Sequence, residues 1–125
     1  MARIGTSLGS SHVRQYTYKL PDINTREAAK QWVYSVFHNL TFEKRELSIR
    51  FPDNPKIPTR TIAYEIPEEQ FSRWCEIPKA APEAVLALWR DGKRAMFIMN
   101  LDSCVLTMLC GDAKLVEWME EKLKL

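Results

Sequence analysis

The sequence predicts an α+β domain, in which a single, mostly antiparallel sheet of about five strands carries roughly three or four packed helices. Two patterns support this fold class. Segments 43–51 and 59–66 alternate apolar and polar residues, which is typical of antiparallel strands with one solvated face. Segment 25–39 repeats its apolar residues every three or four positions, which is typical of an amphipathic helix. A chain of 125 residues can bury a core of its own, so we expect one domain over 13–125.

The N-terminal third predicts an arm, a strand and a helix. Residues 1–12 are small and polar, so we expect a flexible arm. Segment 13–20 alternates and contains two tyrosines, which favours a strand that Pro21 ends. The helix that follows opens with Asn24-Thr-Arg-Glu27, which has the form of a capping box.

Prolines divide the middle of the chain. Three of them stiffen the loop 52–58 between the two alternating strands. Pro67 opens a short helix, because proline suits a first helical turn. Pro82 opens another helix, which Gly92 terminates. The inward residues of this second helix are expected to be Ala84, Val85, Leu88 and Trp89.

The last third predicts a hairpin and a helix. Segments 94–101 and 104–110 are apolar on both faces, which favours strands in the middle of a sheet. Gly111 and Asp112 precede a final helix over 112–124. The expected order is therefore β-α-β-β-α-α-β-β-α.

Residues for catalysis or metal binding are not evident. Cys75, Cys104 and Cys110 lie among apolar neighbours, so we expect reduced core thiols and no zinc site. His38 suits the dipole of a last helical turn better than acid–base chemistry. We expect that the protein binds no cofactor and is not an enzyme. The alternative is an enzyme whose Tyr, Ser or Asp residues converge only in the folded structure. No segment resembles a signal peptide or a membrane span, so we expect a cytoplasmic protein.

Surplus apolar surface favours a small accessory or regulatory protein that acts through protein contacts. The hairpin and the last helix carry more apolar side chains than we expect a small domain to cover with its own helices. The predicted partner is a protein or a second copy of the chain, in a homodimer or another homo-oligomer. The residues expected at this interface are Val116, Trp118, Leu125, Phe97 and Met99.

The charge distribution favours nucleic-acid binding as an alternative. Residues 1–60 contain ten Lys and Arg against five Asp and Glu, whereas residues 61–125 contain eight against eleven. Clustered positive charge with nearby tyrosines is typical of surfaces that bind a polyanion. The cations expected to contact nucleic acid, in the arm and in strands 43–51 and 59–66, are Arg3, Arg14, Lys19, Lys44, Arg45, Arg50 and Arg60.

Overall fold

A computed structural model of the chain describes residues 3–8, 13–39, 42–50, 60–63 and 83–125. Within these residues the helices are α1 (Arg26–Asn39) and α3 (Ala113–Leu123). The strands are β1 (Arg3–Leu8), β2 (Arg14–Lys19), β3 (Lys44–Arg50), β4 (Arg60–Ala63), β5 (Glu83–Arg90), β6 (Lys93–Asn100) and β7 (Val105–Cys110).

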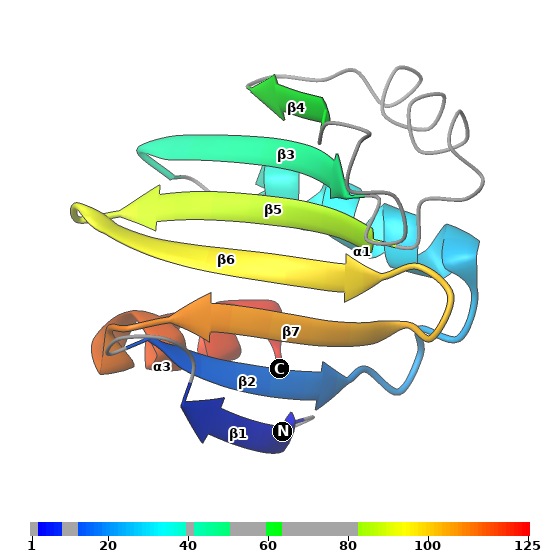
Figure 1. Cartoon of the computed structure of the whole chain (residues 1–125), viewed down its shortest axis with the longest axis horizontal. Coiled ribbons are helices and arrows are strands. Elements are labelled where there is room, and N and C mark those ends of the chain that lie inside the picture. The colour runs from blue at the N-terminus through cyan, green and yellow to red at the C-terminus, as the bar shows by residue number, and fades with distance from the viewer. Residues whose placement is uncertain (1–2, 9–12, 40–41, 51–59, 64–82) are drawn as a thin grey trace.

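All seven described strands form one antiparallel sheet in the order β1-β2-β7-β6-β5-β3-β4. The predicted α+β class is correct at this level, but the sheet has more strands than the five expected. The predicted hairpin corresponds to β6 and β7, and it lies in the middle of the sheet (Figure 1). Because each of these strands is paired on both sides, the hairpin has no free edge for a second copy to extend.

Both described helices lie on one face of the sheet, behind it in Figure 1. The side chains of β6 and β7 that point to this face are almost fully buried, and Trp32 of α1 packs edge-on against Phe97 at 6.0 Å between ring centroids. On the other face, Met96, Ile98 and Leu109 are only partly buried. The core is therefore concentrated between the sheet and the two helices.

The predicted N-terminal arm contains an edge strand. Arg3–Leu8 forms β1 and pairs with β2, with a register shift between Arg3 and Gly5. Ile4 lies within this irregularity and is 62% exposed. The small, polar composition that predicts an arm is also compatible with a strand whose outer edge faces solvent, because such a strand buries few of its side chains.

The helix predicted from Pro82 to Gly92 is wrong, because Glu83–Arg90 forms strand β5. It is joined to β6 by a turn in which Asp91 and Gly92 both have positive φ, 53° and 74°. An Asp-Gly pair in this conformation is typical of the two-residue turn that matches the twist of a β-hairpin. β5 lies between β3 and β6 in the sheet, where burial on both faces removes the alternation that would have marked it as a strand.

The helix ends differ in one detail from the sequence prediction. The α1 cap is Thr25, whose hydroxyl accepts a hydrogen bond from the Ala28 amide at 3.1 Å. Glu27 is therefore not the capping-box partner, and it pairs instead with Lys30 at 2.9 Å. At α3 the predicted cap is confirmed, since the Asp112 carboxylate accepts from the Leu115 amide at 2.8 Å.

Some predicted features lie outside the described residues. These are the loop 52–58, the short helix after Pro67, and Cys75. Cys104 and Cys110 are buried free thiols, and burial raises the pKa of the Cys110 thiol. Among the described residues, no helix has both the length and the apolar character needed to cross a bilayer.

Candidate functional site

The residues predicted for a protein interface lie mostly in the core. Phe97 and Met99 are 1% and 0% exposed on the helix-covered face of β6, while Val116 and Leu125 are 3% and 4% exposed. Only Trp118 is partly exposed. The other four residues are buried within the described part of the chain, and the predicted interface stays a prediction. The physical reason for this burial is that α1 and α3 together cover the apolar surface that the sequence analysis left without a cover.

Arg3, predicted to contact nucleic acid, has a different partner. Its guanidinium donates two hydrogen bonds of 2.6 Å to the Glu120 carboxylate and lies 4.7 Å from the centroid of the Tyr16 ring. The fully buried Tyr18 hydroxyl donates to the same carboxylate at 3.0 Å. Burial, followed by the hydrogen bond to Glu120, raises the pKa of Tyr18, so the phenol stays a donor. Arg3 thus joins the first strand to the last helix.

Three other predicted cations, Lys19, Arg50 and Arg60, do not lie beside Arg14, which begins β2. Lys19 is at the other end of β2 and donates to the carbonyl oxygens of Ile23 and Ser103, each at 3.2 Å. Arg50 pairs in register with Glu83 at the far end of β5. Arg60 pairs with Ile49, which lies at an odd position of β3, whereas Lys44 and Ser48 lie at even positions. Successive residues of a strand point to opposite faces of the sheet, so the register does not place Arg60 on the face of Lys44.

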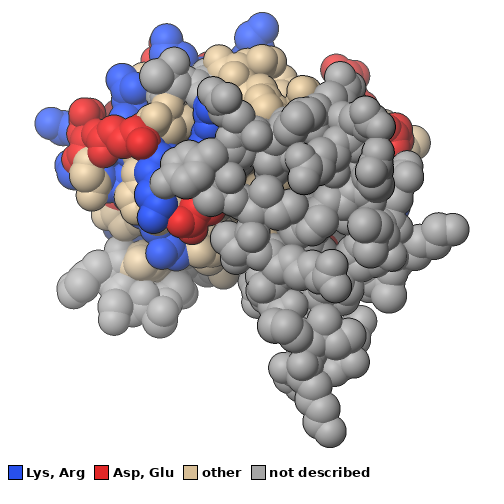
Figure 2. Space-filling view, turned by 90° about the horizontal axis from the view of Figure 1, so that it is seen from above, with Lys and Arg blue, Asp and Glu red and all other residues tan. Residues whose placement is uncertain are grey.

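The remaining predicted cations gather at one end of the sheet with four that the sequence analysis missed. A transverse row of paired residues runs across five strands from Arg14 through Cys110, Ala95 and Leu88 to Arg45. At or beyond this row lie the positively charged side chains that define what we call the basic end: Arg14, Lys44, Arg45, Arg90, Lys93, Arg94 and Lys114. Figure 2 shows blue side chains, with some red ones among them, gathered at the left end of the molecule, where Figure 1 places the β5–β6 turn.

Two tryptophans organise the cations of the basic end. Trp89 is flanked in register by Lys44 and Arg94, whose charged groups lie 4.9 and 5.9 Å from its ring centroid. On the helix-covered face, the Arg90 guanidinium lies 3.9 Å from the centroid of the Trp118 ring. Phe42 supports Trp118 edge-on, with the two ring centroids 5.9 Å apart. These contacts hold three cations in place without neutralising them.

Three carboxylates near the basic end accept hydrogen bonds, one from backbone amides and two from cations of the basic end. Glu43 accepts from the Asp91 and Gly92 amides at 2.5 and 3.3 Å and so closes the β5–β6 turn. Glu46 pairs with Lys44 at 3.0 Å. Asp112 pairs with Lys93 at 2.6 Å in addition to capping α3. The hydrogen bond between them lowers the pKa of Asp112 and raises that of Lys93.

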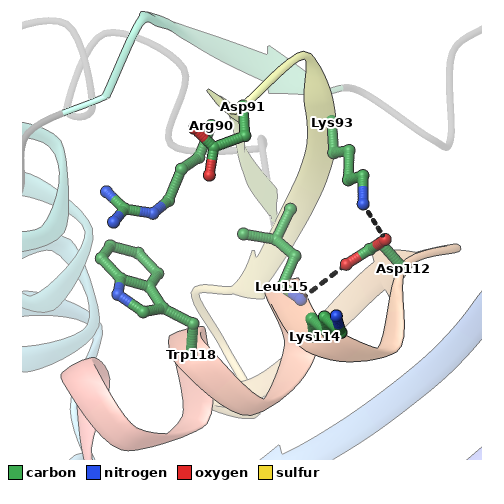
Figure 3. Close-up of a pocket in the computed structure, with 7 residues that line it drawn as sticks. All are labelled: Arg90, Asp91, Lys93, Asp112, Lys114, Leu115 and Trp118. Carbon is green, nitrogen blue, oxygen red and sulfur yellow. Dashed lines mark hydrogen bonds and ion pairs between the residues drawn. The ribbon is translucent and has the colours of Figure 1, made fainter.

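A pocket of about 250 Å³ opens at the basic end between the β5–β6 turn and the start of α3. Figure 3 shows Arg90 lying over Trp118 on one side and the Lys93–Asp112 pair on the other, with Asp91 between them. The pocket is lined by Arg90, Asp91, Lys93, Asp112, Lys114, Leu115 and Trp118. Within the described residues, no ion pair engages Arg14, Arg90, Arg94 or Lys114.

Within the part of the chain that the structure describes, no three His, Cys, Asp or Glu side chains are grouped so that they could hold a metal ion. His38 lies in the last turn of α1, with its ring 4.3 Å from that of Tyr34. Comparison of the chain with models of known protein families, with curated proteins and with solved structures finds no match.

Proposed function

We propose that this protein binds nucleic acid, and single strands in particular, through the basic end. The observation that carries the proposal is the gathering of seven cations from both halves of the sequence at one end of the sheet, where three of them lie on two tryptophan rings. Such a surface supplies the two interactions that single strands use, phosphate neutralisation by Lys and Arg and stacking of bases on aromatic rings.

The charge balance supports a polyanion as the ligand. The seven cations face four carboxylates, those of Glu43, Glu46, Asp91 and Asp112, which leaves a balance of +3. Among the described residues, fifteen Lys and Arg stand against eleven Asp and Glu, a balance of +4, so most of their net positive charge lies at the basic end. The described part of the molecule is therefore electrically asymmetric, and its field would orient a polyanion toward this end.

The environment of Trp89 supports single strands over a duplex. The ring is partly exposed on the sheet face opposite the helices, between Lys44 and Arg94. An unpaired base can stack on such a ring while the flanking cations contact the phosphates on either side. In a duplex the bases are already stacked on one another, so only the phosphate contacts would remain.

The test is the salt dependence of binding to a single-stranded oligonucleotide with a 5′-hydroxyl end. The variant Arg14→Gln with Arg94→Gln removes two cations of the basic end. The matched control, Arg26→Gln with Lys122→Gln, removes two cations elsewhere and gives the same net charge. Each lost phosphate contact lowers the slope of log K against log salt by about 0.7 for a single strand, so the first variant should lose about 1.4. The control should keep the wild-type slope.

Equal slopes for the two variants would contradict the proposal, because binding would then depend on net charge alone. No binding of the wild-type protein at about 50 mM salt would contradict it outright, since nonspecific affinity is highest at low salt. A matched duplex should bind less tightly than the single strand, and substitution of Trp89 by Leu should remove this preference.

The predicted role in protein contacts stays a prediction. Four of its five interface residues are buried in the core, and the hairpin expected to mediate self-association is paired on both sides. The described surface therefore gives that role less support than it gives nucleic-acid binding.

A further inference from the structure

We propose that the pocket beside Trp118 binds a phosphomonoester, the terminal phosphate of a nucleic-acid strand or of a free nucleotide. The inference deepens the proposed function and rests on it for the strand end as a ligand. It depends on the pairing of the charged side chains that line the pocket, on the way Trp118 holds Arg90, and on the volume of the pocket.

The unpaired charges of the pocket favour an anion. Lys93 is paired with Asp112 at 2.6 Å, and the Asp112 carboxylate also accepts a hydrogen bond from the Leu115 amide. Arg90 and Lys114 have no ion pair within the described residues. A phosphomonoester carries a charge of about −1.5 to −2 at neutral pH, whereas a phosphodiester inside a strand carries about −1. The unpaired charges, Arg90 and Lys114 against Asp91, leave a balance of +1, which attracts the more highly charged terminal phosphate more strongly than an internal one.

Trp118 holds the Arg90 guanidinium in position. The guanidinium lies 3.9 Å from the ring centroid, and Phe42 braces the ring from its edge. A guanidinium stacked on a ring keeps the N–H groups at its rim available, and phosphate oxygens can accept two of them at once. Since the side chain is already ordered, binding costs less conformational entropy than it would for a mobile arginine.

The volume of the pocket limits what can enter. About 250 Å³ is below the ~300–1,000 Å³ of sites that enclose a drug-sized ligand. It suits a phosphate with part of its sugar, and the base would stay outside. An internal phosphate is joined to sugars on both sides, so it enters a small, half-open pocket less easily than a strand end does.

Asp91 gives the inference a specific control. Its carboxylate lines the pocket and would repel a phosphate. Asn is well suited to the positive φ of 53° at this position, and Asn-Gly is as favourable as Asp-Gly in this turn. Asp91→Asn should therefore keep the fold and strengthen binding of the phosphate.

The experiment measures binding of two otherwise identical single-stranded oligonucleotides, one with a 5′-phosphate and one with a 5′-hydroxyl. A nucleoside 5′-monophosphate serves as the third ligand, and the nucleoside without phosphate is its control. The phosphorylated strand should bind more tightly to the wild-type protein by a factor of about ten, as expected for charge-assisted hydrogen bonds to a charged group. If the free nucleotide binds as tightly as the phosphorylated strand, the source of the ligand is the nucleotide.

The variants locate the effect. Arg90→Met and Lys114→Met should each remove most of the preference for the 5′-phosphate. Asp91→Asn should increase that preference about two- to threefold, the size expected for one exposed charge. Lys122→Met, on the same helix but outside the pocket, should change nothing.

The outcomes separate this inference from the proposed function. If both oligonucleotides bind equally with the expected salt dependence, the pocket inference is overturned and the function stands. If the free nucleotide binds in a way that depends on Arg90 but neither oligonucleotide binds, the function is overturned and the pocket stands. If none of the ligands binds, both are overturned.

Discussion

Arg3 and Arg90 each lie on an aromatic ring, and their surroundings give them opposite roles. Arg3 stacks on Tyr16 at 4.7 Å, and its N–H groups are bound by the Glu120 carboxylate at 2.6 Å. Arg90 stacks on Trp118 at 3.9 Å, with no carboxylate bound to it among the described residues. The first arginine joins β1 to α3. The second faces a pocket.

The difference shows that the nearest carboxylate decides what a cation can do. Glu120 is held almost fully buried by the packing of α3, so Arg3 cannot exchange it for a phosphate without leaving a buried charge. No such competitor holds Arg90.

The largest expected effect is on the Arg3 network. Glu120→Ala removes the acceptor of both Arg3 and Tyr18 and should lower the free energy of unfolding by about 2–3 kcal/mol. This is less than the ~3–5 kcal/mol for breaking a fully buried pair, because the Arg3 side chain is 31% exposed and can recover water. Urea denaturation measures the change, and the exposed neighbour Glu121→Ala should stay within about 0.5 kcal/mol of wild type. A similar loss for both variants would show that the network does not stabilise the fold.

A smaller effect is expected for the tyrosine hydroxyl. Tyr18→Phe deletes the 3.0 Å hydrogen bond to Glu120 and should cost about 1–2 kcal/mol, the range for a hydrogen bond to a charged group. Tyr16→Phe is the matched control, because the Tyr16 ring contacts Arg3 but its hydroxyl makes no hydrogen bond within the described residues. Denaturation midpoints measured in parallel check the contrast. Equal losses would mean that packing, not the Glu120 network, dominates at both positions.

The smallest effect concerns Lys93, whose partner Asp112 is partly exposed. Lys93 lowers the pKa of Asp112 below its usual 3.8. A lowered folded-state pKa contributes stability that is present above the unfolded value and is lost as pH falls through the folded value. Unfolding midpoints should therefore fall as the pH is lowered through the usual pKa of Asp112 and on through its lowered folded-state pKa. Asp112→Asn keeps a capping side chain and should flatten this part of the profile, and an unchanged profile would contradict the ion pair.

The fold was predictable from sequence where one face of an element is wet. The sequences of the helix 25–39 and the strand 13–20 show the periodicity of these elements, because their polar positions face solvent. Strand β5 does not, since Ala84 to Leu88 are all buried and the segment has no alternating pattern. The stronger signal was local: Asp91-Gly92 predicts a hairpin turn. Gly92 also suits the end of a helix, so this residue alone does not distinguish the two structures.

The candidate site was predictable only in part, and for a related reason. Arg14, Lys44 and Arg45 were identified as cations, but Arg90, Lys93 and Arg94 were hidden by the false helix. A hairpin turn at Asp91-Gly92 places Arg90, Lys93 and Arg94 together at its tip. The pairing of β5 with β3, which brings Lys44 beside Trp89, is non-local. Sequence also could not show that Glu120 would engage Arg3, because the two lie at opposite ends of the chain.

The central claim is tested most directly by comparing Arg90→Met with Arg3→Met. Both are assayed for binding to a 5′-phosphorylated single strand over a range of salt concentrations, at a temperature where both variants are folded. We predict that Arg90→Met lowers the salt slope by about 0.7, as expected for one lost phosphate contact, and that Arg3→Met leaves it unchanged. A lower slope for Arg3→Met, or an unchanged slope for Arg90→Met, would contradict the account.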